Sequence, residues 1–359
     1  MTTFLSRCFR AWRGAALALL VTLPAVAGAQ DTTGVGFEPI TIHDPVGGGD
    51  MPGYVFYPAA EKGTVTWRGP YRLEAAADAS PLPGAKPLVV ISHGHAGSAL
   101  GHHDLAEYLA RHGFVVATLQ HPRDNSADAS GDGHPAVMIG RAVQVRATID
   151  MLLADPQWKT LVDPARIGVA GFSNGGYTSL LVVGAVPRFT RFAAHCEAHP
   201  DDPGICGNYK QIVATLARQG QTPTQMLESM QAQFQRWGDP HDTRVRAAFA
   251  MAPLSLVFDE TGLASIDRPV FLYYGEQDEV LRPDYNFRHI IPLMKTLAGV
   301  RTIPKAGHYV FLSPCSEELT KEIPDLCKDP AGVDRADVHA RVDADALAFF
   351  RRTLAAQAH

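Results

Sequence analysis

Continuous apolar runs alternate with segments of helical periodicity along most of the chain. A run without polar interruption predicts a strand covered on both faces, as in a parallel sheet between helices. Such runs lie at 87–92, 114–120, 167–171, 245–251, 270–274 and 300–303. Helical patterns lie near 102–112, 137–154, 175–186, 285–298 and 335–356. The alternation predicts an α/β fold, with a mostly parallel sheet flanked by helices.

Two regions depart from this alternation. Residues 36–75 have shorter strand patterns, which suit an antiparallel edge of the sheet. Residues 188–243 are polar and lack a convincing strand, so we expect a helical, lid-like insertion there. Within it, Thr222-Pro223 is typical of a helix start, because threonine caps well and proline suits the first helical position. Gly238 is a plausible end for that helix.

One apolar face of the insertion has two possible roles. Met226, Met230 and Phe234 recur every four residues, so they share one side of a helix. In the simpler interpretation this face packs on the core. In the other it covers the active site and, together with Trp237, contacts the substrate.

The first 29 residues are typical of a secretory signal peptide. Arg7, Arg10 and Arg13 precede an apolar stretch, and Ala27-Gly28-Ala29 is a small-residue cleavage site. The apolar stretch is too short to span a bilayer as a stable helix. We therefore expect a periplasmic or secreted protein without stable membrane insertion, formed by one large domain over 30–359.

Charge limits the classes of binding partner, and cysteine content indicates the cellular compartment. Without the three arginines of the predicted leader, the chain has 29 basic and 37 acidic residues. No basic run points to nucleic acid. The four remaining cysteines are an even number, which favours disulfides in an exported chain. Sequence proximity favours Cys196–Cys206 and Cys315–Cys327 among three possible pairings. A zinc site is the competing interpretation, but neither spacing resembles a CxxC pair.

The motif with the clearest chemistry is Gly171-Phe172-Ser173-Asn174-Gly175. It follows an apolar strand and opens a helical segment, the setting of a nucleophile elbow. A serine on so sharp a turn needs glycines two residues to either side, because a Cβ there would collide with neighbouring backbone. Ser173 is therefore the predicted nucleophile.

The residues that would activate this serine follow in the expected order. A serine nucleophile needs a base, and the base needs a carboxylate that orients it. Asp278 closely follows the strand at 270–274, and His308 follows the next strand. We predict a Ser173–His308–Asp278 triad, in which Glu276 and Glu279 are nearby substitutes for the acid.

An oxyanion hole is the third requirement of such a site. One backbone donor is expected from Asn174, which follows the nucleophile. The other is expected from His95, in the turn after the strand at 87–92. Only the main chain is needed there, so the imidazole of His95 need not take part.

A dense group of histidines near this turn suggests metal as an alternative. The group consists of His93, His95, His102 and His103. Two adjacent histidines on a helix do not both face one ion comfortably, and no carboxylate or cysteine pattern completes a site. We expect no metal here and no cofactor.

Several motifs together resemble a known family. They are His93-Gly94-His95-Ala96-Gly97-Ser98, 102–106, 121–125, 171–177, 191–206 and Ala306-Gly307-His308. They resemble the exported "predicted dienelactone hydrolase" group of the α/β-hydrolase superfamily, which is similar to platelet-activating-factor acetylhydrolases and bacterial polyester hydrolases. The resemblance covers about 36–355 and implies the same triad and oxyanion donors. Dienelactone hydrolases use a cysteine nucleophile, so the group's name says little about the substrate.

The expected function is the hydrolysis of carboxylic esters through an acyl-enzyme. The substrate is expected to be a small-molecule or polymeric ester, and the protein is expected to be a monomer. Lactone, thioester or amide hydrolysis, or acyl transfer, remain alternatives on the same triad. A binding protein that has lost catalysis is the alternative from another class.

Overall fold

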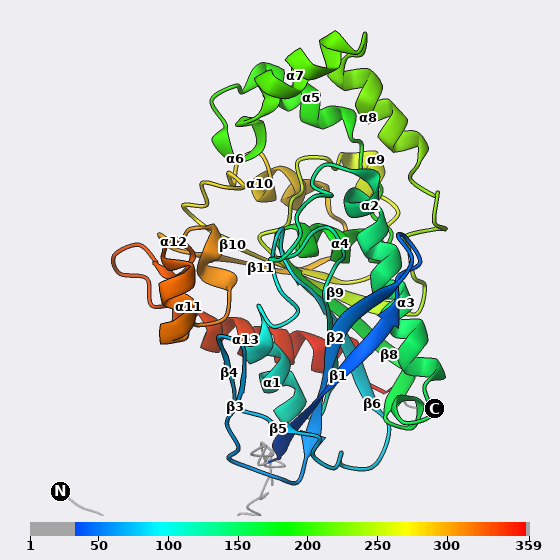
Figure 1. The fold of residues 1–359 in the computed structure, drawn as a ribbon, viewed down its shortest axis with the longest axis vertical. Helices are drawn as coiled ribbons and strands as arrows, with labels where there is room; N and C mark the ends of the chain where they lie inside the picture. Colours follow the sequence, from blue (N-terminus) through cyan, green and yellow to red (C-terminus); the bar gives the residue numbers. More distant parts are fainter. Residues whose placement is uncertain (1–32, 357–359) are drawn as a thin grey trace, which may run out of the picture. The chain divides into compact units, whose positions relative to one another are not determined.

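The computed structural model describes residues 33–356, within which nine strands form one mixed sheet (Figure 1). Their order is β11-β10-β9-β8-β6-β7-β2-β1-β5. Neighbours from β11 to β7 are parallel. These six strands are β6 (Lys86–Ser92), β7 (Val115–Leu119), β8 (Val162–Phe172), β9 (Val245–Met251), β10 (Val270–Gly275) and β11 (Leu297–Ile303). The predicted mostly parallel sheet is confirmed. The predicted signal peptide lies outside the described residues.

The opening stretch forms the antiparallel edge that its sequence predicts. β1 (Gly34–His43) pairs antiparallel with β2 (Asp50–Ala59), which pairs antiparallel with β7. β1 and β2 have 10 residues each, so they are longer than the pattern indicates. β5 (Ala76–Ala77) closes the edge beside β1, and a separate two-stranded sheet joins β3 (Thr66–Arg68) to β4 (Tyr71–Leu73).

Helices cover both faces of the sheet because successive strand residues point to opposite sides. In β6, Leu88 and Val90 belong to one core cluster, and Val89 and Ile91 belong to the other. The first cluster contains side chains of α3 (Gly140–Ala154) and α4 (Asn174–Val182). The second contains side chains of α1 (His103–Arg111) and α13 (Arg335–Thr353). None of the helices within 33–356 combines the length and the apolar character needed to cross a bilayer.

The helix predicted over 285–298 is wrong. The chain forms only α10 (Phe287–Ile290) and a 3-10 turn, η2 (Ile291–Leu293), before it enters β11 at Leu297. Pro292 lacks a backbone N–H, and its ring clashes with the preceding turn of an α-helix. The start of β11 is set by pairing, since Leu297 lies opposite Val270 of β10.

Between α4 and β9 the chain forms a group of helices and no strand. They are α5 (Thr190–Ala198), α6 (Pro203–Cys206), α7 (Tyr209–Arg218) and α8 (Pro223–Ala232), and they gather beyond the end of the sheet where α4 begins (Figure 1). α8 starts as predicted, because the Thr222 hydroxyl accepts from the backbone N–H of Gln225. It ends at Ala232, so the predicted end at Gly238 is wrong.

The remaining helices are short. They are α2 (Pro135–Met138), η1 (Trp158–Thr160), α9 (Glu260–Leu263), η3 (His308–Phe311), α11 (Glu317–Glu322) and α12 (Pro324–Cys327). η3 matters most for function, because it begins at the predicted base.

Candidate active site

Ser173 lies at the junction of β8 and α4 with a strained backbone. Its φ of +55° and ψ of −116° are rare for a residue with a side chain. The two flanking glycines are required by space. A Cβ on Gly171 would lie 2.2 Å from the Gly175 carbonyl oxygen, and one on Gly175 would lie 1.9 Å from the Ser92 carbonyl oxygen. The sharp turn therefore holds the Ser173 hydroxyl at the end of the sheet.

The three predicted triad residues lie in hydrogen-bond contact. His308 Nε2 is 2.9 Å from Ser173 Oγ, and His308 Nδ1 is 2.6 Å from Asp278 Oδ2. All three side chains are buried, and Asp278 is only 2% exposed. Ser173 is separated from His308 by 135 positions in the sequence, so the contact depends on the sheet order. In the sheet, β9 lies between β8 and β10, the strands that precede Ser173 and Asp278.

Asp278 is held in place by its own loop. Its Oδ1 atom accepts hydrogen bonds from the backbone N–H groups of Val280 (3.0 Å) and Leu281 (2.7 Å), which leaves Oδ2 for His308. The two alternative acids lie elsewhere. Glu276 accepts from the backbone N–H of Lys305, and Glu279 is exposed. Of the three carboxylates, Asp278 alone bonds to the imidazole.

The residues of both predicted oxyanion donors line the same cavity as Ser173. The backbone N–H groups of His95 and Asn174 donate to no protein group within residues 33–356. His95, Ser173 and Asn174 line one cavity of about 330 Å³. Asn174 is also the first residue of α4, where the helix dipole favours negative charge. The arrangement suits a developing alkoxide beside Ser173.

Asp124 connects the two oxyanion segments, and sequence reasoning did not identify it as a site residue. Its fully buried carboxylate accepts from His95 Nδ1 at 2.6 Å and from the Ala96 backbone N–H at 3.0 Å. It also accepts from Asn174 Nδ2 at 3.0 Å and from Arg141 Nη1 at 2.5 Å. Asp124 follows β7 and belongs to 121–125, one of the motifs that carry the family resemblance, but that motif indicated no role for it. Asp124 thus fixes one donor segment against the other.

Arg141 balances this buried negative charge. Its guanidinium also donates to the His93 carbonyl oxygen and to Ser92 Oγ, so it braces the start of the oxyanion turn. Burial alone would raise the pKa of Asp124, but the His95 hydrogen bond and the Arg141 charge hold that pKa well below its usual range. Burial and the same Arg141 charge lower the pKa of His93 to about 3. His93 is therefore neutral at physiological pH.

The four histidines near this turn have separate partners. His93 bonds to the Gly94 carbonyl oxygen, and His95 bonds to Asp124. His102 packs edge-on against Phe172, and His103 bonds to Glu107. Their rings therefore do not converge on one point. Phe172 in turn lies against the His308 ring, with centroids 4.7 Å apart, and so packs on the predicted base.

Replacing His95 with alanine tests whether its main chain or its side chain matters. The predicted oxyanion donor is a backbone N–H, so His95→Ala keeps it and loses only the hydrogen bond to Asp124. We expect kcat for an activated ester to fall about 10-fold, against the 10²–10³-fold typical of a lost oxyanion donor. Steady-state kinetics will measure this ratio. A loss of about 10²-fold or more would instead indicate that the imidazole itself takes part, since general acid–base catalysis contributes about 10²–10⁴-fold.

The residues predicted to contact substrate divide into two groups. Met226 and Met230 of α8 line the Ser173 cavity, together with Phe192, Ile205 and Leu254. Phe234 and Trp237 lie beyond the end of α8 and are not among the residues that line that cavity. Trp237 instead lines a separate cavity beside Asp44, Arg123 and His134. α8 is shorter than its periodicity indicates. Phe234 and Trp237 therefore do not continue the helix face formed by Met226 and Met230.

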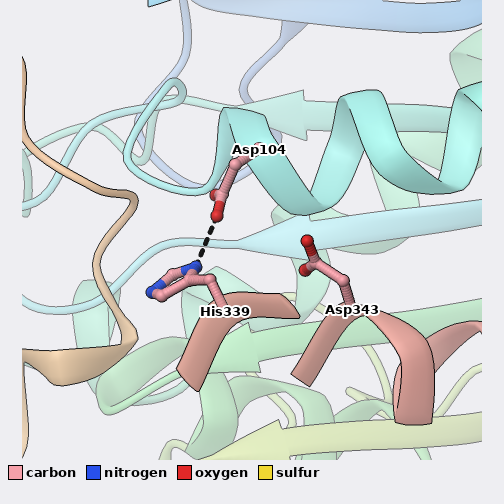
Figure 2. Close-up of side chains that lie close together, drawn as sticks. All are labelled: Asp104, His339 and Asp343. Atoms are coloured by element: carbon pink, nitrogen blue, oxygen red, sulfur yellow. Dashed lines mark hydrogen bonds and ion pairs between the residues drawn. The ribbon is translucent and has the colours of Figure 1, made fainter. Parts of the chain in front are cut away.

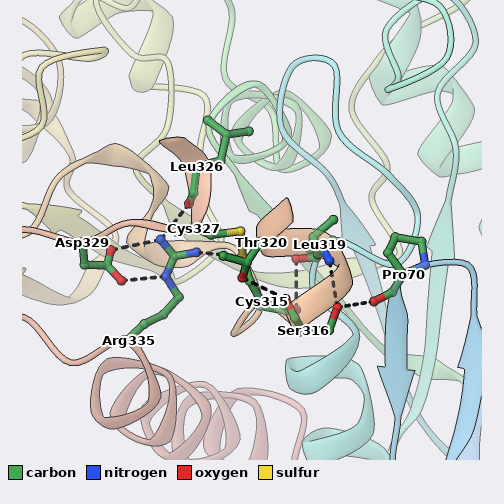
Figure 3. Close-up of a disulfide and its surroundings, with 11 residues drawn as sticks. Pro70, Cys315, Ser316, Leu319, Thr320, Leu326, Cys327, Asp329 and Arg335 are labelled. Carbon is green, nitrogen blue, oxygen red and sulfur yellow. Dashed lines mark hydrogen bonds and ion pairs between the residues drawn. A yellow bond between two sulfur atoms is a disulfide. The ribbon is translucent and has the colours of Figure 1, made fainter. Parts of the chain in front are cut away.

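The two disulfides are those that sequence proximity favours. Cys196–Cys206 is buried and joins α5 to α6, and Cys196 lines the Ser173 cavity. Cys315–Cys327 spans 12 residues just beyond η3 and is partly exposed (Figure 3). Arg335 lies against this bridge, pairs with Asp329 and donates to the Leu326 carbonyl oxygen.

The second bridge should stabilise the region that carries His308. A bridge that closes a loop of this length lowers the entropy of the unfolded chain. This raises the free energy of the unfolded state by about 3 kcal/mol. We expect a Cys315→Ser/Cys327→Ser variant to unfold about 4 °C below the parent in calorimetry, with a smaller loss of kcat. A variant with the parent's Tm would show that the bridge constrains nothing.

Comparisons with known proteins agree with this geometry at the level of the fold. Residues 66–134, about a fifth of the chain, match the family "Platelet-activating factor acetylhydrolase, isoform II". That segment holds the oxyanion turn and Asp124 but none of the triad residues. A ferulic acid esterase from Streptomyces cinnamoneus is similar with a TM-score of 0.57 and 21% sequence identity, over 92% of each chain. The chain therefore has the fold of an α/β-hydrolase.

Proposed function

We propose that this protein is an exported serine hydrolase that cleaves carboxylic esters of apolar acyl groups through an acyl-enzyme. The observation that carries the proposal is the buried Ser173–His308–Asp278 chain, placed beside two backbone N–H groups at one cavity. The similarity to an esterase and to part of an acetylhydrolase family supports the same reaction class. Two disulfides fit an oxidising compartment, and with the predicted leader they support a periplasmic or secreted location.

The first half of the reaction transfers the acyl group to the enzyme. His308 Nε2 takes the Ser173 proton while Ser173 Oγ attacks the ester carbonyl carbon. The His95 and Asn174 amides donate to the carbonyl oxygen as it becomes negative. His308 then gives its proton to the leaving alkoxide, and the C–O bond breaks to release an alcohol.

The second half returns the enzyme to its starting state. Water, deprotonated by His308 Nε2, attacks the acyl-enzyme carbonyl carbon, and the same amides hold the second oxyanion. His308 returns the proton to Ser173 Oγ, and the carboxylic acid leaves. Throughout, Asp278 Oδ2 accepts from His308 Nδ1 and stabilises the imidazolium. The residues described need no cofactor for this cycle.

The lining of the cavity supports an apolar acyl group. Most of its side chains come from α5 to α8 and are aliphatic, aromatic or sulfur-containing. They include Phe192, Ile205, Ile212, Met226, Leu227 and Met230. These helices cover one side of the space next to Ser173, so the insertion acts as the lid-like wall of the acyl pocket.

A series of nitrophenyl esters tests this function. Each methylene buried in an apolar pocket contributes about 0.8 kcal/mol, so kcat/KM should rise about fourfold per methylene from acetate until the cavity is filled. Absence of turnover with every ester would favour a non-catalytic binding protein. Products formed with added alcohol separate hydrolysis from acyl transfer, because a transferase yields the new ester in place of the acid.

The wall residue Met226 should set the acyl chain length. Met226→Trp places a larger side chain into the cavity, so we expect kcat/KM for octanoate to fall about 10-fold or more relative to acetate. Trp237→Leu is the matched control, since Trp237 lines a different cavity, and it should leave the ratio unchanged. Equal ratios in Met226→Trp and the parent would place the acyl group elsewhere.

A further inference from the structure

A second cluster of chemically active side chains lies away from Ser173, between α1 and α13. Asp104 comes from the first turn of α1, and His339 and Asp343 face it from α13 (Figure 2). Each offers a ligand atom, and these atoms lie within 4.8 Å of one another. We propose that Asp104, His339 and Asp343 form a zinc-binding site that joins α1 to α13.

The hydrogen bonds around the cluster leave the correct atoms facing inward. His339 Nε2 donates to the Val310 carbonyl oxygen at 2.9 Å, so its other nitrogen, Nδ1, is directed at Asp104. A metal-binding histidine commonly donates its outer N–H to a backbone carbonyl in this way. Asp104 is also supported from outside, since its Oδ1 atom accepts from the Ser313 hydroxyl at 2.5 Å. The Asp104 Oδ2 atom remains on the side of His339.

The surroundings of the Asp343 side chain point to a missing cation. Its side chain is buried, with 7% of the residue exposed, and its Oδ1 atom has no hydrogen-bond partner within residues 33–356. A buried polar group without a partner is costly, and a buried carboxylate is more costly still. His339 and Asp343 are four positions apart on one helix, so they lie on the same face. A cation bound by all three groups would satisfy Asp343.

The charges and donor types select a divalent ion of the zinc class. Two carboxylates and one neutral imidazole carry a charge of −2, which Zn²⁺ cancels. Mixed imidazole and carboxylate donors suit Zn²⁺, whereas Mg²⁺ and Ca²⁺ prefer oxygen ligands alone. The fourth position opens on a cavity of about 420 Å³ that Asp104 and Asp343 also line, which leaves room for water.

Binding requires one local rearrangement. In a tetrahedral zinc site, neighbouring ligand atoms are about 3.4 Å apart. The direct hydrogen bond between His339 and Asp104 must therefore open, and the proton it holds leaves as the ion enters. Since His339 also bonds to Val310 in η3, the ion would tie α1 and α13 to the helix that begins at His308. This role is independent of the proposed ester hydrolysis.

Metal binding and unfolding of the whole disulfide-bonded protein test this site. The protein is stripped with a chelator, freed of it and titrated with Zn²⁺ alone, and native mass spectrometry and calorimetry follow binding. We expect one Zn²⁺ per chain and a Tm rise of about 4 °C at a free concentration 100 times the Kd. The same concentration of Ca²⁺ should give no rise.

Two single substitutions on α13 locate the ion. Asp343→Asn keeps the shape of the side chain but replaces a ligand carboxylate with a neutral amide, so the metal-free variant should unfold close to the parent while losing the zinc-dependent rise. Asp337→Asn changes an exposed carboxylate on the same helix and should keep the rise. No bound zinc, no rise in the parent, or equal rises in both variants would overturn the proposal.

Discussion

Ser173→Ala is expected to lower kcat for a nitrophenyl ester by about 10⁵–10⁶-fold. The variant lacks the oxygen that becomes acylated, and His308 then has no hydroxyl to deprotonate. The residual rate should stay above that of water, since the His95 and Asn174 amides still stabilise the oxyanion of direct water attack. Steady-state kinetics with the parent's substrate and a calorimetric Tm measure both the loss and the integrity of the fold.

Ser179 provides the matched control for this substitution. It is a buried serine on α4, the helix that follows Ser173, and its hydroxyl donates to the Gly175 carbonyl oxygen at 2.9 Å. Ser179→Ala should cost about 1 kcal/mol of stability and change kcat only a few-fold. A Ser173→Ala enzyme that kept activity near the Ser179→Ala level would show that another residue attacks the ester.

The second large effect is expected from Asp278→Asn. The two backbone N–H groups of Val280 and Leu281 will hold the amide oxygen where Oδ1 now lies, so the amide NH₂ will face His308. His308 Nδ1 then becomes an acceptor, and the ring proton moves to Nε2, which can no longer take the Ser173 proton. Loss of the correct tautomer should lower kcat about 10⁴-fold with little change in KM.

Glu276→Gln is the control for the acid. Glu276 is two residues away and, among residues 33–356, accepts a hydrogen bond only from the Lys305 backbone N–H, a role that glutamine can fill. Its kcat should remain within a few-fold of the parent's. If the two substitutions had equal effects, the acid of the triad would not be assigned to Asp278.

Much of the fold and the order of the triad can be predicted from the sequence, because the determinants are local. Gly171 and Gly175 are required by a collision between a Cβ and the backbone, so the elbow is visible in five residues. Asp278 and His308 closely follow strands that are themselves readable as apolar runs. Parallel strands place such ends along one edge of the sheet.

The parts that could not be predicted depend on distant contacts or on where a helix stops. Asp124 reaches Asn174 across 50 positions, and Arg141 meets the His93 carbonyl across 48, so no spacing rule reveals them. His339 meets Asp104 across 235 positions. Phe234 follows the periodicity of Met226 and Met230, and Trp237 lies three positions beyond it, but α8 ends at Ala232 before it reaches either residue.

The central claim, that Ser173 is the nucleophile of an acyl-enzyme, is tested most directly by covalent labelling. The protein is treated with a serine-directed phosphonate and digested, and the modified peptide is located by mass spectrometry. We expect one adduct per chain, on Ser173, formed in step with the loss of esterase activity and absent from Ser173→Ala. An adduct on another residue, or full activity after Ser173 is labelled, would contradict the account.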